Sequence, residues 1–369
     1  MSKGGSDFNM QKITTQELSD NLRATVEFGG NAFICGQRGS GKTMIAKDII
    51  PLSGCKEVYL NMSTLERADF AGYPNFFGSK ERKYVDFLLP AFFELLMEGN
   101  DPVVALLDEV DKAESSLWAP LLEFTQFHTM NGRKLPNLKA IIMTGNLPSE
   151  GGQRPCLPLL DRAEKYILEA SSTQWLDWAA KSGQIHPSVA AYIADHPDDL
   201  FGETDPGDIY ADPSPRGWHN ASKILFFGEE NKWGNKILTN KVSGCIGKKA
   251  GMKYSAYFDH YRVLLPIVER IMEGKKIDGF RDLEQTKQMV ASMIVCARVA
   301  RILDEMKPKA AFPEAISNVA GFLKSVDPEM ALISVRSQIG LDRMINKGLD
   351  DQTEWDEILK SIASRISMP

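Results

Sequence analysis

Residues 32–50 read AFICGQRGSGKTMIAKDII, and this stretch decides the fold. Its centre, residues 36–43, is a complete G-x-x-x-x-G-K-T pattern. A short apolar run precedes the pattern and a helical one follows it, which is the order of strand, loop and helix that a phosphate-binding loop requires. The stretch therefore predicts a phosphate-binding loop in an α/β domain.

The residue types of this loop suit phosphate chemistry. Glycines let backbone N–H groups close around phosphate oxygens, and the N-terminus of the following helix favours an anion. Lys42 can reach the β- and γ-phosphates of a nucleotide, and the hydroxyl of Thr43 can bind Mg²⁺. A glycine-rich turn that only joins a strand to a helix is the plainer alternative. We expect nucleotide contacts from Gly36, Gly39, Ser40, Gly41, Lys42, Thr43 and Met44.

A second motif lies about 65 residues downstream of the first. Residues 103–107, VVALL, form the continuous apolar run of a central parallel strand, and Asp108 and Glu109 follow at its end. Asp108 would belong to the nucleotide site, where it would hold Mg²⁺, usually through a water molecule. Glu109 would orient the water that attacks the γ-phosphate. Two solvated acids after a strand are common, but the phosphate loop upstream favours the functional reading, which is the Walker B pattern.

Three further polar residues are candidates for the same site. Asn146 follows the apolar run 140–144, Arg162 stands in LPLLDRAEK, and Arg216 stands in DPSPRGW at the start of a helical pattern. A turn asparagine and two surface or capping arginines are the plainer readings. A γ-phosphate, however, needs positive charge that becomes more effective as the transition state develops. We therefore keep all three as candidate catalytic residues.

Composition limits the class of protein. The chain has 369 residues, of which 43% are hydrophobic and 25% charged, as in an ordinary folded protein of about two domains. A net charge of −6 argues against a surface built for nucleic acid. The five cysteines are scattered without a C-x-x-C pair, and the N-terminus lacks the apolar run of a signal peptide. No apolar run is long enough to span a bilayer, so we expect a cytoplasmic protein that binds no membrane.

The pattern of apolar residues divides the chain near residue 172. Before it, short apolar runs alternate with helical patterns, which predicts a five-stranded parallel sheet with flanking helices over residues 1–172. After it, residues 173–369 show only helical periodicity, with one long polar loop at 197–213. The expected strands are 31–35, 57–61, 102–107, 139–144 and 165–168. The expected helices are 175–181, 187–194, 215–227, 254–272, 283–306, 313–326 and 328–345.

A hairpin is predicted over residues 129–139, because Asn131-Gly132 is a strong signal for a tight turn. We expect Met130 and Arg133 to be exposed there, where they could contact a partner, although a plain surface hairpin would look the same. Four aromatic residues of a nearby loop could face that partner or belong to the core with equal plausibility. They are Phe70, Tyr73, Phe76 and Phe77.

Taken in order, these motifs resemble the AAA+ ATPases. More closely, they resemble the MoxR-like branch, in a subgroup of bacterial and phage ATP-binding proteins whose helical lid begins near a D-S-P-R-x-W type motif, here DPSPRGW at 212–218. The resemblance covers about residues 14–345. It implies a P-loop AAA+ fold with an all-α lid and a helical C-terminal extension. It also implies ATP and Mg²⁺ as cofactors.

The resemblance also assigns roles to the candidate residues. Asn146 would be the sensor-1 residue, Arg162 the arginine finger offered to a neighbouring subunit, and Arg216 the sensor-2 arginine of the lid. Ala163 stands where the family usually has an aromatic residue. Arg154 and Arg82 are therefore alternative residues for acting on a neighbour.

The activity implied by the resemblance is ATP hydrolysis in a homo-oligomeric ring, most often a hexamer, coupled to remodelling or assembly of a protein client. For the MoxR-like branch the client is expected to be a protein with a von Willebrand factor A domain. The hairpin at 129–139 and the loop around 70–77 would line the central face of the ring. Three alternatives stay open: a DNA-acting motor of phage or host defence or replication, an ATP-gated binding platform with little turnover, and a small-molecule kinase.

Overall fold

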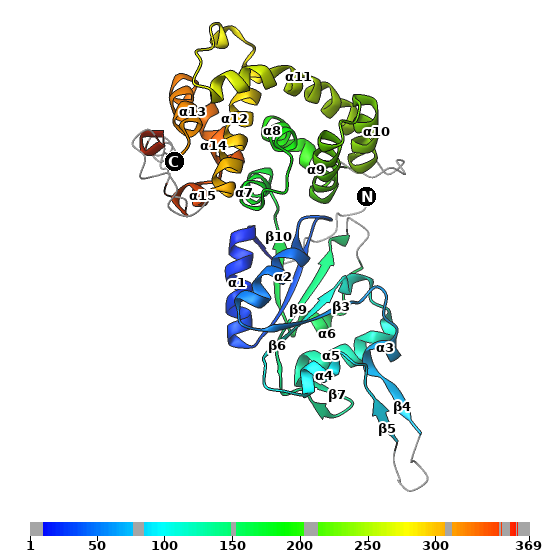
Figure 1. Ribbon diagram of the computed structural model, residues 1–369. Helices are drawn as coiled ribbons and strands as arrows, with labels where there is room; N and C mark the ends of the chain where they lie inside the picture. The colour runs from blue at the N-terminus through cyan, green and yellow to red at the C-terminus, as the bar shows by residue number, and fades with distance from the viewer. Residues whose placement is uncertain are drawn as a thin grey trace, which may run out of the picture. The chain divides into compact units, whose positions relative to one another are not determined.

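The computed structural model describes residues 10–76, 85–148, 153–202, 213–306, 312–346, 348, 355–358 and 360. The chain forms two compact units, Met1–Ala170 and Ser171–Pro369, which are shown in Figure 1. We call them the first and the second unit. Phe77 and Arg82, and Asp212 of the DPSPRGW motif, lie outside the described residues.

The first unit is built on a parallel sheet of six strands in the order β1-β10-β2-β9-β6-β3. The predicted fold class is confirmed, and each of the five predicted strands is present. The sheet has one strand more than expected, because β1 has only three residues and is too short to show a periodicity. The strands are β1 (Gln11–Ile13), β2 (Asn31–Gly36), β3 (Lys56–Asn61), β6 (Val103–Asp108), β9 (Leu138–Asn146) and β10 (Glu164–Leu168).

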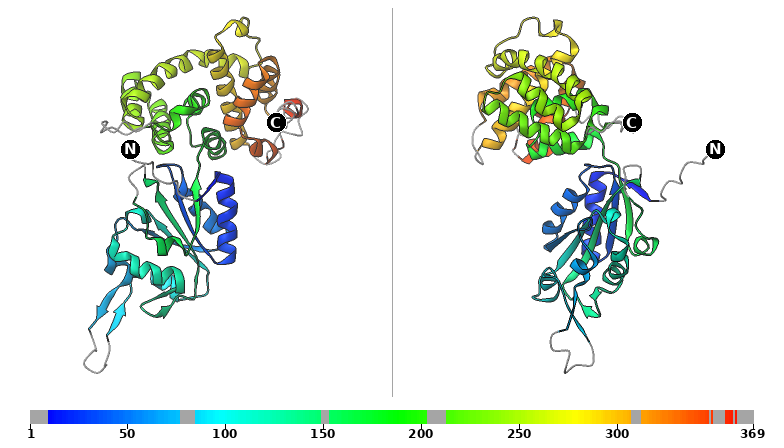
Figure 2. Two further views of the ribbon diagram at one scale, coloured as in Figure 1. Left: turned by 180° about the vertical axis from the view of Figure 1, so that it is seen from behind. Right: turned by 90° about the vertical axis from the view of Figure 1, so that its right-hand side faces the viewer.

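Helices cover both faces of this sheet, as Figure 2 shows. Successive residues of β6 belong alternately to two core clusters: Val103, Ala105 and Leu107 to one, and Val104 and Leu106 to the other. This alternation explains why the strand is apolar throughout. The helices are α1 (Thr15–Phe28), α2 (Lys42–Leu52), α3 (Arg67–Ala71), α4 (Phe93–Met97), α5 (Trp118–Phe127) and α6 (Leu157–Leu160).

Two antiparallel hairpins extend the first unit. One pairs β4 (Tyr73–Asn75) with β5 (Asp86–Leu88), and the other pairs β7 (Thr129–Met130) with β8 (Arg133–Lys134). The predicted tight turn is confirmed, because Asn131 and Gly132 both have positive φ. The expected exposure of Met130 is wrong: its side chain is fully buried in a core cluster. The hairpin β7–β8 therefore packs on the body of the unit through Met130, while its turn and Lys134 are exposed and Arg133 is half-buried.

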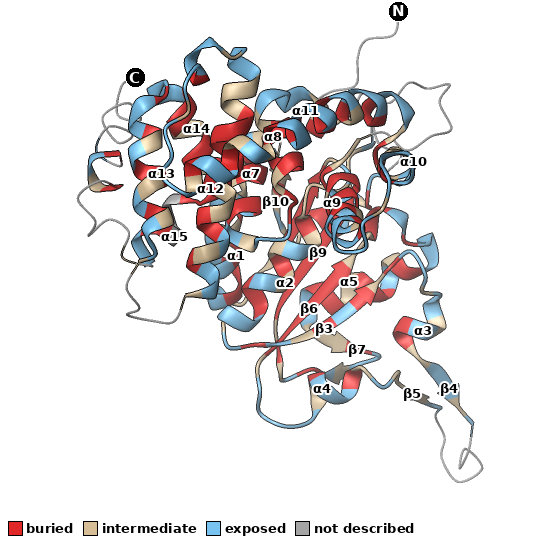
Figure 3. Ribbon diagram, turned by 45° about the horizontal axis from the view of Figure 1, so that its top comes forward, coloured by how far each residue is buried: buried red, intermediate tan, exposed pale blue. Residues whose placement is uncertain are grey.

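The second unit is helical throughout its described part, as predicted. Figure 3 shows that the inward faces of its helices are buried. Helix α10 was not predicted, because its buried residues Leu238, Val242 and Ile246 are too sparse for a clear signal. The predicted helix 328–345 is two helices, because Gly340 adopts a positive φ between them. The helices are α7 (Ser172–Ser182), α8 (Pro187–Asp195), α9 (Pro215–Glu230), α10 (Asn235–Ile246), α11 (Lys248–Met272), α12 (Gln285–Glu305), α13 (Glu314–Ser325), α14 (Pro328–Gln338) and α15 (Leu341–Asn346).

Across the described residues of both units, no helix combines the length and the apolar character needed to cross a membrane.

Candidate nucleotide site

The G-x-x-x-x-G-K-T residues form the loop between the carboxyl end of β2 and the start of α2. Gly39 and Gly41 have φ values of 75° and 95°, which favour glycine. A Cβ at Gly36 would lie 2.9 Å from the carbonyl oxygen of Leu168 on the neighbouring strand. These glycines therefore allow a tight loop that side chains would obstruct.

The loop and the start of α2 have the features of an anion site. Gly41 is the N-cap of α2, and the first turn of the helix carries no acidic residue. The hydroxyl of Ser40 is buried and has no hydrogen-bond partner among the described residues. The backbone N–H groups and the dipole of a helix N-terminus stabilise negative charge. Met44 lies in the first turn of α2 and is largely exposed.

Lys42 is held inside this loop. Its side chain is nearly buried, and Nζ donates hydrogen bonds to the carbonyl oxygens of Gly36 and Gln37 at 2.9 and 2.8 Å. A third hydrogen bond of 3.4 Å runs from Nζ to Oδ1 of Asn146 at the end of β9. The lysine therefore joins the loop to the end of the neighbouring strand β9.

Asp108 lies at the end of β6 and accepts three hydrogen bonds. Thr43 donates to Oδ1 at 2.8 Å, Thr144 of β9 donates to the same oxygen, and Tyr59 of β3 donates to Oδ2 at 2.9 Å. Burial, followed by the hydrogen bond to Asp108, raises the pKa of Tyr59 to about 12. The tyrosine therefore remains a donor at neutral pH.

The oxygen atoms of Thr43 and Asp108 fit Mg²⁺, which prefers hard oxygen ligands and keeps several waters. No group of three or more His, Cys, Asp or Glu side chains in the described part of the chain could hold a metal by itself. A magnesium ion at this place would thus be held by Thr43 and Asp108 together with phosphate and water.

Glu109 directly follows Asp108, and Asn146 ends the neighbouring strand β9. Glu109 has a φ of 56°, which is unusual for a residue with a side chain and is often found at functional sites. Its carboxylate forms an ion pair of 2.8 Å with Lys112, and its backbone N–H lies 3.4 Å from Oγ1 of Thr144. Asn146 is the last residue of β9 and pairs in register with Gly36 of the phosphate loop.

The two predicted arginines belong to other elements of the fold than this cluster. Arg162 precedes β10, and β10 runs parallel to β2 with Glu164 opposite Ala32 and Leu168 opposite Gly36. Arg162 therefore lies at the amino edge of the sheet, whereas the phosphate loop lies at the carboxyl edge. Its guanidinium donates to Oε1 of Gln126 and to the carbonyl oxygen of Pro158. Arg216 belongs to the second unit, where it is exposed in the first turn of α9.

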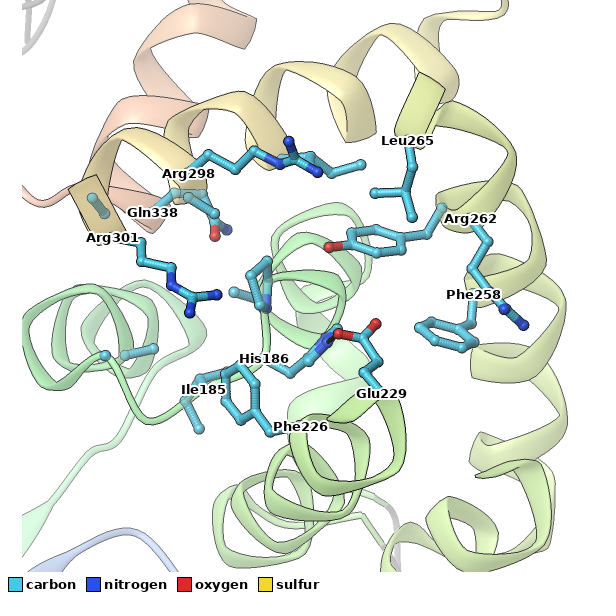
Figure 4. Close-up of a pocket in the computed structure, with 18 of the residues that line it drawn as sticks. Ile185, His186, Phe226, Glu229, Phe258, Arg262, Leu265, Arg298, Arg301 and Gln338 are labelled. Atoms are coloured by element: carbon cyan, nitrogen blue, oxygen red, sulfur yellow. Dashed lines mark ion pairs between the residues drawn. The ribbon is translucent and has the colours of Figure 1, made fainter. Parts of the chain in front are cut away.

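A separate cavity of about 850 Å³ lies within the second unit, among α7, α8, α9, α11, α12 and α14 (Figure 4). His186 accepts the backbone N–H of Ser188 at Nδ1, so that Nε2 faces the carboxylate of Glu229 at 3.2 Å. The hydroxyl of Ser188 links His186 to the hydroxyl of Tyr254. These four side chains form one continuous chain of hydrogen bonds, which we call the His186 network.

Three residues of the nucleotide site have no signal in the sequence motifs. Thr144 and Tyr59 hold Asp108 from the two strands beside β6, and Asp111 contacts Asn146. Each of these three residues is distant in the sequence from the residue that it contacts. The pairing of the strands brings the contacting residues together. The sequence indicates Thr144 only in that it is a polar residue near the end of an otherwise apolar strand.

Comparison with known proteins agrees with this geometry. Residues 31–163 match the family model described as the AAA domain of the dynein-related subfamily. No curated protein matches the chain. A solved structure of the closed state of Hsp104 with ATPγS and FITC casein is similar over 46% of this chain and 39% of that chain, with 16% identity and a TM-score of 0.31. Residues 31–163 are thus similar to an AAA domain, and the parallel sheet with flanking helices that they form in the first unit is consistent with the AAA+ P-loop fold.

Proposed function

We propose that this protein is a cytoplasmic AAA+ ATPase of the MoxR-like branch. In this proposal it hydrolyses ATP at the interfaces of a homo-oligomeric ring, most simply a hexamer. It couples hydrolysis to the remodelling or assembly of a protein client. The observation that carries the proposal is the position of Arg162 at the sheet edge opposite to the phosphate loop.

The residues of the carboxyl edge have the chemistry that ATP hydrolysis requires. Lys42 and the loop N–H groups would bind the phosphates, while Thr43 and Asp108 would hold Mg²⁺. Bound Mg²⁺ would neutralise charge that develops on the phosphate oxygens. Glu109 would orient and polarise the attacking water, and Asn146 would donate a hydrogen bond to that water or to the γ-phosphate.

None of the residues just named is an arginine, and Arg162 lies at the other edge of the sheet. The four steps along β10 from Glu164 to Leu168 span about 13 Å at roughly 3.3 Å per residue, and Arg162 precedes the strand. An arginine side chain cannot span that distance and also hold the orientation that catalysis requires. A head-to-tail arrangement would bring the Arg162 edge of one subunit to the loop edge of the next, and repetition of one such interface closes a ring. Arg216 would act as the sensor-2 residue from the second unit.

The hairpin β4–β5 supports a protein client. The side chains of Tyr73, Phe76 and Leu88 are more than half exposed on or next to it, and Figure 1 shows it projecting from the body of the first unit. Such exposed apolar groups commonly mark protein contacts. Arg133 joins the hairpin β7–β8 to the hairpin β4–β5 by an ion pair with Asp86. We therefore place the client face on these two hairpins, with a von Willebrand factor A domain protein as the first client to test.

The test of the shared site mixes two inactive variants. Arg162→Ala should bind ATP without turnover, since an arginine finger contributes on the order of 10³ to 10⁵ in rate. Lys42→Ala should not bind ATP. A mixed ring contains interfaces where an intact Lys42 of one subunit faces an intact Arg162 of the next, so ATPase activity should return. Arg154→Ala in place of Arg162→Ala is the matched control and should stay active by itself.

A flat, inactive titration across mixing ratios would remove Arg162 from this role, provided that size and label transfer show that the subunits exchange. The search would then move to Arg154 and Arg82. Activity in isolated monomers of the unmodified chain would contradict the ring itself.

A further inference from the structure

Asp111 is a buried acid that the roles above do not use. It lies in a 3₁₀ turn, Val110–Lys112, directly after the Asp108-Glu109 pair, and its side chain is 1% exposed. A Cβ on Gly145 of β9 would lie 3.1 Å from its Oδ1 and 3.3 Å from its Cβ. The carboxylate is therefore packed against the backbone of the strand that ends in Asn146.

The hydrogen bonds of this carboxylate are incomplete. Oδ2 accepts from the side-chain amide nitrogen of Asn146 at 3.4 Å, and Oδ1 has no partner within the described part of the chain. Burial raises the pKa of Asp111, and hydrogen bonds from Asn146 act in the opposite direction. A buried acceptor without a full set of partners costs stability, so this position is not explained by packing.

Asn146 is thereby held between two groups that fix which way its amide faces. Its Oδ1 accepts from the ammonium of Lys42, and its Nδ2 donates to Asp111. The reverse orientation would place N–H groups against the ammonium and an oxygen against the carboxylate. An amide nitrogen carries two hydrogens, so one is used by Asp111 and the second is left for another acceptor.

We propose that Asp111 is the positioning residue of the ATPase site: it anchors one N–H of Asn146 so that the second N–H is aimed at the γ-phosphate or the attacking water. This inference rests on the proposed function. Asp111 itself touches neither water nor phosphate in this role. It acts through Asn146, and its effect belongs to the chemical step rather than to the binding of nucleotide.

The central test removes the acceptor but keeps the length of the side chain. Asp111→Leu should lower kcat on the order of 10-fold, the cost of losing one well-placed hydrogen bond. KM for ATP and the affinity for a fluorescent ATP analogue should change by less than about 3-fold. Asp111→Asn keeps an acceptor oxygen and should restore most of the activity. Glu114→Leu, which removes an exposed acid three residues further on, is the matched control and should behave as the unmodified chain.

A double-mutant cycle with Asn146→Ala separates positioning from a general structural effect. If Asp111 acts through Asn146, then Asp111→Leu should have no further effect on kcat in the Asn146→Ala background. Losses that multiply, or an Asp111→Leu variant with unchanged kcat, would overturn the inference. Should Asp111→Leu fail to fold, Asp111→Ala removes the same acceptor without adding apolar bulk and carries the same cycle.

A second readout needs neither nucleotide nor turnover. In the ligand-free protein, the side-chain NH₂ signals of Asn146 can be identified in ¹H–¹⁵N spectra by their absence in Asn146→Ala. The chemical shifts of these signals should change in Asp111→Leu and should not change in Glu114→Leu. If they do not respond to Asp111→Leu, the inference is wrong even if the protein hydrolyses ATP. If they respond but the unmodified chain never hydrolyses ATP, the proposed function fails while the contact between Asp111 and Asn146 stands.

Discussion

The two units each bury a group of polar side chains, and the groups differ in how their hydrogen bonds are completed. At the nucleotide site of the first unit, the hydroxyl of Ser40 and Oδ1 of Asp111 have no partner among the described residues. In the second unit, the buried side chains of Tyr254, Ser188 and His186 bond to one another in the His186 network, which ends at the exposed carboxylate of Glu229. The first group has hydrogen-bonding atoms that a ligand could use, whereas the buried members of the second group use theirs on one another.

The difference teaches how to separate a functional polar cluster from a structural one. Buried polar groups without partners and the positive φ of Glu109 lower the stability of the fold. Such unfavourable features are common at sites that bind a ligand or carry out a reaction. A satisfied network instead contributes to packing and specifies how helices α8, α9 and α11 meet.

The largest effect is expected from Lys42→Ala. Removing the ammonium should lower the affinity for ATP by more than about 100-fold, because a charge-assisted contact with phosphate is lost inside a nearly buried loop. Binding of a fluorescent ATP analogue measures the change. Lys47→Ala, one turn further along α2 and half-exposed, should bind normally. Comparable losses in both variants would show that the helix, and not the Lys42 contact, was affected.

Glu109→Gln should keep nucleotide binding and lose turnover by about 10² to 10³, because the glutamate acts mainly on the attacking water. Single-turnover hydrolysis and equilibrium binding separate the two quantities. If the protein assembles as proposed, the same variant should trap the ATP-bound ring together with its protein client. An equal loss of binding and turnover would contradict the division of roles between Glu109 and Lys42.

In the second unit, Tyr254→Phe should lower the free energy of unfolding by about 1 to 3 kcal/mol, since it leaves the buried hydroxyl of Ser188 without one partner. Affinity for nucleotide should not change. Tyr257→Phe is a sharp control, because the hydroxyl of Tyr257 is buried without a partner among the described residues. Its removal should be neutral or stabilising in the same chemical denaturation experiment. Equal destabilisation by both variants would mean that the His186 network adds nothing beyond packing.

The smallest effect is expected from Glu229→Gln, and it should depend on pH. Burial alone would raise the pKa of Glu229, but the hydrogen bond from His186 and the charge of Arg262 bring that pKa below the usual 4.5. A folded pKa below the unfolded one gives stability that is fully present above pH 4.5 and is lost as the pH falls through the folded value. The difference in Tm between the unmodified chain and Glu229→Gln should therefore be constant at neutral pH. It should shrink toward zero as the pH falls below 4.5. A difference that widens below pH 4.5 would reverse the sign of this shift.

Much of the nucleotide site could be predicted because its main residues stand in contiguous motifs. The phosphate loop, the Asp108-Glu109 pair and Asn146 each follow directly from a strand whose apolar run is visible in the sequence. Met130 was misjudged for the opposite reason. A turn signal shows where the chain reverses, but not which side of a two-residue strand packs on the core.

The sequence by itself therefore determined the α/β unit, the helical unit and the polar residues that follow the carboxyl ends of the strands. These depend on neighbouring residues and on periodicity, which are local properties of a chain. Only the tertiary structure decided that Thr144 and Tyr59 complete Asp108, that Arg162 lies at the far edge of the sheet, and that Asp111 holds Asn146. The physical reason is that strand order and register bring together residues distant in the sequence, and no local pattern encodes which strands become neighbours.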